Sequence, residues 1–329
     1  MGKKDIVYDL PEEELDPDRI AYNHDIPEGE PVQVKELWAY VMTGEESHYS
    51  PEKCVTDLCY FSADVNSYGE LSAVPDPEKF VSYSGRLHLV GTCTGRSLTH
   101  MVLEPSFGLR DNLVNSLVTA TKGYDGLQID YENVPFRDRD NFIDFLSELR
   151  NKLPKEKMLT VALAARTREI RDDSYSYTKT APLVDRIIIM AYDEHWSGSK
   201  PGSVASIEWC DKVSDYCKTV IPEEKLVMGL PFYGRSWQTE NFAKAWRFNT
   251  INREMNRSAI THVERDDGIP FFTCIIPIEV TAYFDDVYSL VRRCRIYEDK
   301  SVDKIAFWRL CQEDPEFWNW VKIEKYSED

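Results

Sequence analysis

The segment Asp125-Gly126-Leu127-Gln128-Ile129-Asp130-Tyr131-Glu132 decides how the rest of the chain is interpreted. With the two-residue repeat of a β-strand, Leu127, Ile129 and Tyr131 point to one face and Gln128, Asp130 and Glu132 to the other. One face is therefore apolar and the other is acidic. A half-buried strand with its acidic face in water has the same pattern, so the flanking sequence must distinguish the two interpretations.

The flanking residues favour a strand of a parallel sheet. Tyr124, Asp125 and Gly126 are typical of a turn, and residues 137–153 follow with apolar side chains on one helical stripe. A strand followed by an amphipathic helix is the repeating unit of a parallel sheet, and both faces of such a sheet are normally covered. Inward carboxylates must then be hydrogen-bonded, paired or used in chemistry. We expect Asp130 and Glu132 at the C-terminal mouth of the strand.

Composition limits the class of partner. The chain has 329 residues, 42% of them hydrophobic, which is enough for one large core. Its net charge of -18 opposes binding to nucleic acid and to anionic membranes, and a neutral or cationic substrate is more natural. The sequence contains no apolar run of membrane-spanning length and no apolar signal-peptide region behind the first lysines. We expect a soluble monomer without membrane insertion.

The eight cysteines form no C-x-x-C pair, and the six histidines do not cluster. Most of the cysteines lie in predicted strands or helices, where a reduced cysteine packs as a small apolar residue. This favours free buried thiols over one or two disulfides, and no metal or other cofactor is expected.

The order of the elements favours a (β/α)8 barrel in one catalytic domain, residues 32–329, preceded by an acidic N-terminal arm, residues 1–31. Amphipathic helices separate most of the eight apolar runs. A small inserted lobe is expected at about 238–283, between the seventh and eighth strands. An open doubly wound sheet is the alternative, although no G-x-G-x-x-G turn supports a dinucleotide site. The predicted strands are 34–41, 55–65, 86–93, 126–132, 158–165, 186–193, 225–233 and 304–310.

Polar and aromatic residues end several of these strands, where a barrel of this kind has its active site. Strand one offers Tyr40, strand six ends in Met190, Tyr192 and Asp193, strand seven in Tyr233 and Arg235, and strand eight in Trp308. Carboxylates beside aromatic rings suit a sugar, because a ring stacks on its C–H surface while carboxylates bond its hydroxyls. Each ring could equally be a packing residue.

Four motifs in chain order give a resemblance to a known family. The strand-four stretch resembles the D-x-x-D-x-D-x-E signature of glycoside hydrolase family 18, the chitinase-like hydrolases. The M-x-Y-D of strand six, the G-L-P-x-Y-G-R at 229–235 and Trp308 agree with it, and the resemblance spans about residues 34–320. Within the family the chain looks most like bacterial spore-cortex and cell-wall N-acetylglucosaminidases, through Glu132-Asn133-Val134 and residues 283–286. The LysM repeats that often accompany those enzymes do not occur within these 329 residues.

The resemblance implies a substrate-assisted retaining mechanism on a GlcNAc-containing oligo- or polysaccharide. Glu132 would be the acid and then the base, while Asp130 and Tyr192 would hold the 2-acetamido group that attacks the anomeric carbon. It also implies substrate contacts for Gln128, Met190, Asp193, Tyr233, Arg235, Trp308 and Tyr40.

Gln128 departs from the strict motif, where an Asp is frequent. An amide cannot take the proton of Asp130, but its NH2 group could bond Asp130 and hold it ionised, which would alter the pH profile. Three other functions remain open: a catalytically silent carbohydrate-binding relative, a chitinase or N-glycan endo-N-acetylglucosaminidase, and a barrel with only structural or partner-binding roles.

Overall fold

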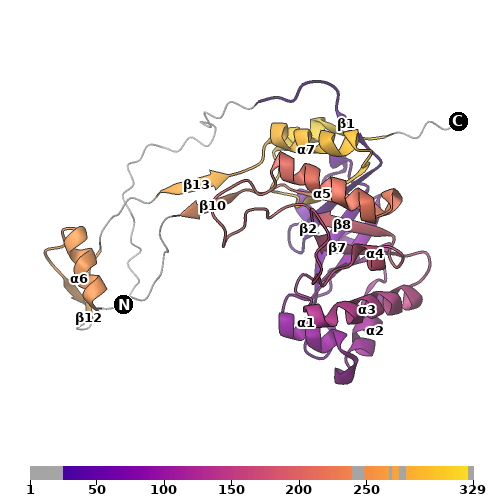
Figure 1. The fold of residues 1–329 in the computed structure, drawn as a ribbon, viewed down its shortest axis with the longest axis horizontal. Helices are drawn as coiled ribbons and strands as arrows, with labels where there is room; N and C mark the ends of the chain where they lie inside the picture. The colour runs from indigo at the N-terminus through magenta and orange to yellow at the C-terminus, as the bar shows by residue number, and fades with distance from the viewer. Residues whose placement is uncertain (1–24, 239–247, 267–268, 274–278, 325–329) are drawn as a thin grey trace.

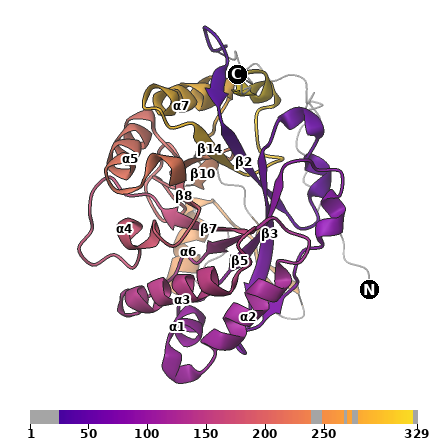
Figure 2. The ribbon, with the colours of Figure 1, turned by 90° about the vertical axis from the view of Figure 1, so that its right-hand side faces the viewer.

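The computed structural model describes residues 25–238, 248–266, 269–273 and 279–324. Eight parallel strands pair in chain order, and the last pairs with the first, so the sheet closes on itself (Figure 2). The predicted (β/α)8 barrel is confirmed. Within these ranges, every helix is too short or too polar to span a lipid bilayer. The barrel strands are β2 (Glu36–Met42), β3 (Asp57–Val65), β5 (Arg86–Thr92), β6 (Gly126–Asp130), β7 (Met158–Ala164), β8 (Arg186–Met190), β9 (Leu226–Pro231) and β14 (Lys304–Trp308).

Helices cover the outside of the barrel, as Figure 2 shows for α2, α3 and α5. The helix predicted at 137–153 is α3, preceded by a short 3-10 turn, η5 (Phe136–Asp138). After β2 and β3 the connections hold only 3-10 turns and the two-residue strand β4 (Leu71–Ser72), which pairs with β3. The α-helices around the barrel are α1 (Arg96–Leu103), α2 (Arg110–Ala120), α3 (Arg139–Lys152), α4 (Tyr177–Thr180), α5 (Ile207–Val220) and α7 (Val287–Asp299). The other 3-10 turns are η1 (Glu46–His48), η2 (Pro51–Lys53), η3 (Pro77–Phe80), η4 (Pro105–Phe107), η6 (Glu223–Lys225) and η7 (Pro315–Asn319).

Two apolar clusters stabilise the barrel, one on each face of the sheet. The larger cluster lies between strands and helices and contains Leu127, Ile129 and Tyr131 of the acidic strand segment. The smaller one fills the barrel interior and includes Trp38 and Tyr40. The interior is thus packed with side chains, as in other barrels of eight strands. The alternation predicted for residues 127–131 is confirmed, because the odd-numbered residues face the helices.

A network of charged side chains closes the N-terminal end of the barrel. Arg86 makes a two-point contact with the fully buried Asp57, which also contacts His88 at 2.8 Å. Arg186 bonds Glu36 from across the barrel. A Cβ atom on Gly126 would lie 2.4 Å from the His88 ring, so only glycine fits there. Gly126, in the segment 125–132, therefore leaves the space that this network needs.

The chain between β9 and β14 forms the insertion predicted in this region. Strands β10 (Arg235–Gln238) and β13 (Val280–Tyr283) pair as an antiparallel ribbon that leads away from the barrel (Figure 1). The ribbon carries α6 (Phe248–Arg257), β11 (Glu264–Asp266) and β12 (Ile269–Phe271). At the other side of the barrel, β1 (Val32–Val34) pairs in parallel with β15 (Val321–Ile323). Residues 1–24 of the predicted acidic arm lie outside the described residues.

Candidate active site

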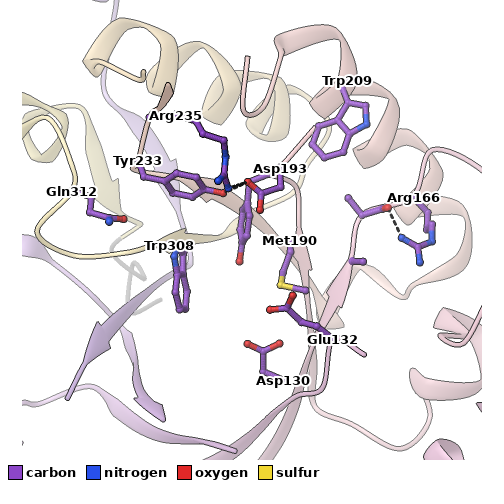
Figure 3. Close-up of a pocket in the computed structure, with 14 residues that line it drawn as sticks. Asp130, Glu132, Arg166, Met190, Asp193, Trp209, Tyr233, Arg235, Trp308 and Gln312 are labelled. Carbon is purple, nitrogen blue, oxygen red and sulfur yellow. Dashed lines mark hydrogen bonds and ion pairs between the residues drawn. The ribbon is translucent and has the colours of Figure 1, made fainter. Parts of the chain in front are cut away.

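A cleft of about 600 Å³ opens at the C-terminal ends of five neighbouring strands, β6, β7, β8, β9 and β14 (Figure 3). The location is the one at which barrels of this type carry their active sites. Eight of the ten residues predicted from the sequence line it: Asp130, Glu132, Met190, Tyr192, Asp193, Tyr233, Arg235 and Trp308. The other lining residues are Ala164, Ala165, Arg166, Trp209, Gly234 and Gln312.

Asp130 and Glu132 both point into this cleft but differ in exposure (Figure 3). Asp130 is the last residue of β6 and is 7% exposed, whereas Glu132 lies two residues beyond the strand and is exposed. The predicted strand, 126–132, is thus two residues too long. Burial, with a smaller contribution from Glu132, raises the pKa of Asp130 to about 8. Loss of solvent and the charge of Asp193 raise the pKa of Glu132.

The Oδ1 atom of Asp130 is buried and has no hydrogen-bond partner. A buried carboxylate oxygen without a donor is costly, and the cost falls if a proton or a ligand donor reaches it. Because this oxygen belongs to a residue that lines the cleft, a ligand with an N–H or O–H group could supply the missing donor. A hydrogen-bond donor placed at this atom would remove that cost.

The backbone around Glu132 is fixed from two sides. The amide of Asn133 donates to the carbonyl oxygen of Thr94, after β5, at 2.8 Å. Tyr175, from the loop after β7, contacts the backbone of both Tyr131 and Val134. These contacts hold the turn that carries Glu132 even though its side chain reaches solvent.

The residues after β8 and β9 form a second polar group at the cleft. Asp193 accepts a hydrogen bond from the Tyr233 hydroxyl at 2.6 Å and pairs with Arg235 (Figure 3). Asp193 has a φ of 59°, in the left-handed region, which turns the chain sharply after Tyr192. Burial and the nearby carboxylates, Asp130 first, raise the pKa of Tyr192 well above its ordinary value. Tyr192 therefore stays a neutral hydroxyl that can donate a hydrogen bond.

Trp308 lies at the end of β14 as a floor for the cleft. Its ring packs at 5.2 Å from the Tyr40 ring and at 4.8 Å, edge to face, from Phe61. Two aromatic side chains from β2 and β3 therefore fix the orientation of the indole. An indole held in this way offers a flat apolar surface to a sugar ring.

Gln128 and Tyr40 do not line the cleft. Gln128 is fully buried in the barrel interior, where it accepts from the Tyr40 hydroxyl at 2.6 Å. Its NH2 group donates to Thr160 at 3.3 Å and to the Cys59 sulfur, not to Asp130. The hydrogen bond to Asp130 proposed from the sequence is wrong, because nearer acceptors in the interior take the amide. Both residues support the floor of the cleft from below.

Sequence reasoning missed Arg166, Trp209 and Gln312. Arg166 lies two residues beyond β7, and the rule that strand ends meet at the mouth of the barrel, applied to strand five, points to it. Trp209 belongs to α5, so no strand-end rule points to it. Gln312 lies four residues beyond β14 in a loop. For the last two residues the sequence contains no signal.

A closed barrel with paired carboxylates and an aromatic floor at its C-terminal mouth defines a site of the glycoside hydrolase type. The model of "Glycosyl hydrolases family 18" matches residues 107–313. The chain therefore belongs to glycosyl hydrolase family 18.

Individual relatives agree with this assignment. The chain is 33% identical over 227 residues to the "Putative sporulation-specific glycosylase YdhD" of Bacillus subtilis, covering 65% of this chain and 53% of that protein. It thus spans about half the length of YdhD. It is 22% identical over 299 residues to the "Cortical fragment-lytic enzyme" of Bacillus anthracis, covering 83% and 68% of the two chains.

A solved structure extends the likeness in fold. The crystal structure of the Bacillus cereus spore cortex-lytic enzyme SleL superposes with a TM-score of 0.71 at 20% identity. The match covers 92% of this chain and 78% of SleL. At this level of identity the match supports the barrel fold.

Proposed function

We propose that this protein is a retaining glycosidase that cleaves β-linked N-acetylglucosamine-containing glycans with help from the substrate's own 2-acetamido group. The observation that carries this proposal is the buried, unpartnered Oδ1 of Asp130, beside Glu132 in one cleft. An acetamido N–H is a donor of the right kind for that oxygen. A glycan without the acetamido group would leave the oxygen unpaired, which makes the site selective.

The two carboxyl groups share the proton that the reaction needs. Burial and the charge of Glu132 raise the pKa of Asp130, while partial loss of solvent and the charge of Asp193 raise the pKa of Glu132. The two carboxyl groups therefore titrate as a pair that retains a proton near neutral pH. In the free protein the more buried Asp130 holds the proton more strongly. When the acetamido N–H donates to Asp130, its ionised form is stabilised, and the proton is then available to Glu132.

In the first step, Glu132 gives its proton to the glycosidic oxygen, and the bond from that oxygen to the anomeric carbon breaks. The acetamido carbonyl oxygen attacks the same carbon and forms an oxazolinium ion. Asp130 holds the N–H side of this group, and the neutral Tyr192 hydroxyl donates to the carbonyl oxygen. In the second step, Glu132 takes a proton from a water molecule, and the water oxygen bonds to the anomeric carbon. The bond from that carbon to the acetamido oxygen breaks, which restores the acetamido group and retains the configuration overall.

The other lining residues are proposed to hold the sugar in place. Trp308 stacks beneath the ring at the cleavage site. The Asp193, Tyr233 and Arg235 group offers hydrogen bonds to hydroxyls at the rim, and Met190 fills the apolar gap beside Glu132. Gln128 and Tyr40 act indirectly, by supporting Trp308 from the barrel interior.

We propose that residues 32–329 form the catalytic unit and act as a monomer on strands of peptidoglycan. Two relatives, named as a putative sporulation-specific glycosylase and a cortical fragment-lytic enzyme, support this substrate. Chitin and chito-oligosaccharides share the β-linked N-acetylglucosamine unit and are the second candidate.

Mass spectrometry of products tests the proposal. The protein is incubated with chito-oligosaccharides and with peptide-free peptidoglycan strands, and the Glu132→Gln variant is the matched control. We expect fragments with the wild type and none with the variant, since an amide cannot donate the proton. If the wild type binds both glycans and cleaves neither, the chain is a carbohydrate-binding relative.

A further inference from the structure

A second pocket, of about 360 Å³, lies beside the catalytic cleft. Its main wall is the loop after β7, and α3, α4 and α5 supply the rest. Arg166 lines both this pocket and the cleft, so the two are neighbours. Figure 3 shows Arg166 where it lines the cleft. We call it the arginine pocket.

The arginine pocket is cationic in an acidic protein. Five cationic side chains line it, Arg139, Arg166, Arg168, Arg171 and Lys179, against the two carboxylates Glu169 and Asp173. The whole chain has a net charge of -18. Salt limits the reach of the overall field to about 8–10 Å, so the local charges decide what binds in this pocket.

Two of these arginines remain available to a ligand. Arg166 is held by Asp173 through two contacts of 2.6 and 3.0 Å, and Lys179 pairs with Asp140 at 2.9 Å. Arg168 and Arg171 are exposed and have no ion-pair partner in the part of the chain that the structure describes. Among the described residues, no side chain occupies either guanidinium fork, so both are open to an anion.

Aromatic rings complete the walls of the arginine pocket. Tyr175 and Tyr177 line it from the chain around α4, and Tyr216 from α5. The rings of Tyr177 and Tyr216 lie 6.1 Å apart and are tilted. Rings beside free guanidinium groups suit a ligand that has both a ring or peptide surface and a negative charge.

We propose that the arginine pocket binds a carboxylate carried by the glycan, so that the substrate is an acidic strand rather than neutral chitin. This inference rests on the proposed function and names its substrate class. Arginine matches a carboxylate with two parallel hydrogen bonds, which gives both affinity and direction. The carboxylate could belong to the lactyl ether of an N-acetylmuramic acid unit or to a peptide attached to it.

The test compares one strand in three forms: peptide-free with its lactyl carboxylates, the same strand with those carboxylates methyl-esterified, and the peptide-bearing strand. The proteins are the wild type, Arg168→Ala/Arg171→Ala, and the control Lys122→Ala/Arg292→Ala. The control removes the same charge from exposed positions outside the arginine pocket. The measured quantity is the ratio of kcat/KM for the acidic strand to kcat/KM for the ester.

We expect a wild-type ratio of about 10 or more, as for one charge-assisted contact. The ratio should fall to near 1 in Arg168→Ala/Arg171→Ala and stay at the wild-type value in the control. A preference seen only with the peptide-bearing strand assigns the carboxylate to the peptide. The proposal is overturned if the wild-type ratio of kcat/KM values is 1 for both acidic strands. It is also overturned if both double variants keep the wild-type ratio. Either result leaves the proposed hydrolysis itself intact.

If the wild type cleaves none of the strands, the proposed function fails. The arginine pocket is then tested by calorimetry, which measures the affinity of the protein for the acidic and for the esterified strand. Tighter binding of the acidic strand, lost in Arg168→Ala/Arg171→Ala only, supports the pocket. Equal binding of both strands overturns it.

Discussion

The hydroxyl of Tyr175 spans Glu132: it donates to the carbonyl oxygen of Tyr131 at 2.5 Å and accepts from the amide of Val134 at 3.2 Å. Tyr175 itself is mostly buried and packs edge to face on Phe142 at 5.8 Å. One side chain from the loop after β7 thus sets the backbone that carries the proposed acid after β6. Together with the bond from Asn133 to Thr94, this places the backbone of the acid under the control of loops after two other strands, β5 and β7.

Removing this hydroxyl should slow the chemical step. In Tyr175→Phe we expect kcat to fall about 10-fold or more with KM within about 2-fold, since a small displacement of a catalytic group is costly. Tyr124→Phe is the matched control, because it removes a buried hydroxyl bond of 2.7 Å to Pro75, away from the cleft. Equal losses of kcat in both variants would contradict a positioning role for Tyr175.

The unpartnered carboxyl of Asp130 should make stability depend on pH. Its pKa in the folded protein, about 8, exceeds its ordinary value of 3.8, so the stability present at pH 4 is lost as pH rises towards 8. Asp130→Asn does not have this loss. The difference in thermal midpoint, Asp130→Asn minus wild type, should therefore increase between pH 5 and pH 9.

Asp140→Asn is the control for this measurement. Lys179 lowers the pKa of the exposed Asp140, so its ion pair is already complete at pH 5. Above that pH, the thermal midpoint of Asp140→Asn should change with pH in the same way as the wild-type midpoint. Parallel curves for Asp130→Asn as well would show that Asp130 is not the buried acid described here.

Gln128 should affect the pH profile by a route other than a bond to Asp130. In Gln128→Asp, a third carboxyl group enters the buried face that Asp130 shares, so the pKa of Asp130 should rise further. The alkaline limb of the pH–rate curve should move to higher pH. An alkaline limb that does not move would refute this account.

The hydrogen bonds of Gln128 should also stabilise the fold. In Gln128→Leu the Tyr40 and Thr160 hydroxyls lose their partner inside the barrel. The free energy of unfolding should fall by about 1–3 kcal/mol, the usual cost of a buried group left unpaired. Denaturant titration measures this change, and an unchanged midpoint would contradict it.

Asp193 should set the upper pH limit of activity. Its charge helps to raise the pKa of Glu132, so Asp193→Asn should let Glu132 lose its proton at lower pH. The alkaline limb should move down by a fraction of a pH unit, because the Asp193 side chain is 44% exposed and solvent screens it. A pH–rate profile of kcat/KM measures the shift, and movement in the opposite direction would be inconsistent with this role.

The barrel could be predicted from the sequence because its strands and most of its helices have clear periodic patterns. Leu127, Ile129 and Tyr131 face the helices as their spacing requires. The ends of strands were less certain, since Tyr131 and Glu132 continue the alternation after the pairing of β6 has stopped at Asp130. Alternation reports which face a side chain takes, not whether the backbone is still paired.

Most of the candidate site followed from one rule, that strand ends meet at the same mouth. The rule does not cover Gln128, which lies two residues before the end of β6 and bonds Tyr40, Cys59 and Thr160 from three other strands. It also fails for Trp209, which reaches the cleft from a helix. Contacts of this kind depend on how far side chains extend in three dimensions, which spacing along the chain does not contain.

The charged network at the N-terminal end of the barrel separates two tasks within one fold. Glu36, Asp57, Arg86 and Arg186 join strands β2, β3, β5 and β8 at the end opposite the cleft. Exchanging loops at the mouth of the barrel should therefore leave these contacts between strands in place. This makes the chain a usable scaffold for protein engineering. Variants with changes confined to the loops after β7 and β9 should still fold, whereas most variants with changes at Asp57 or Gly126 should not.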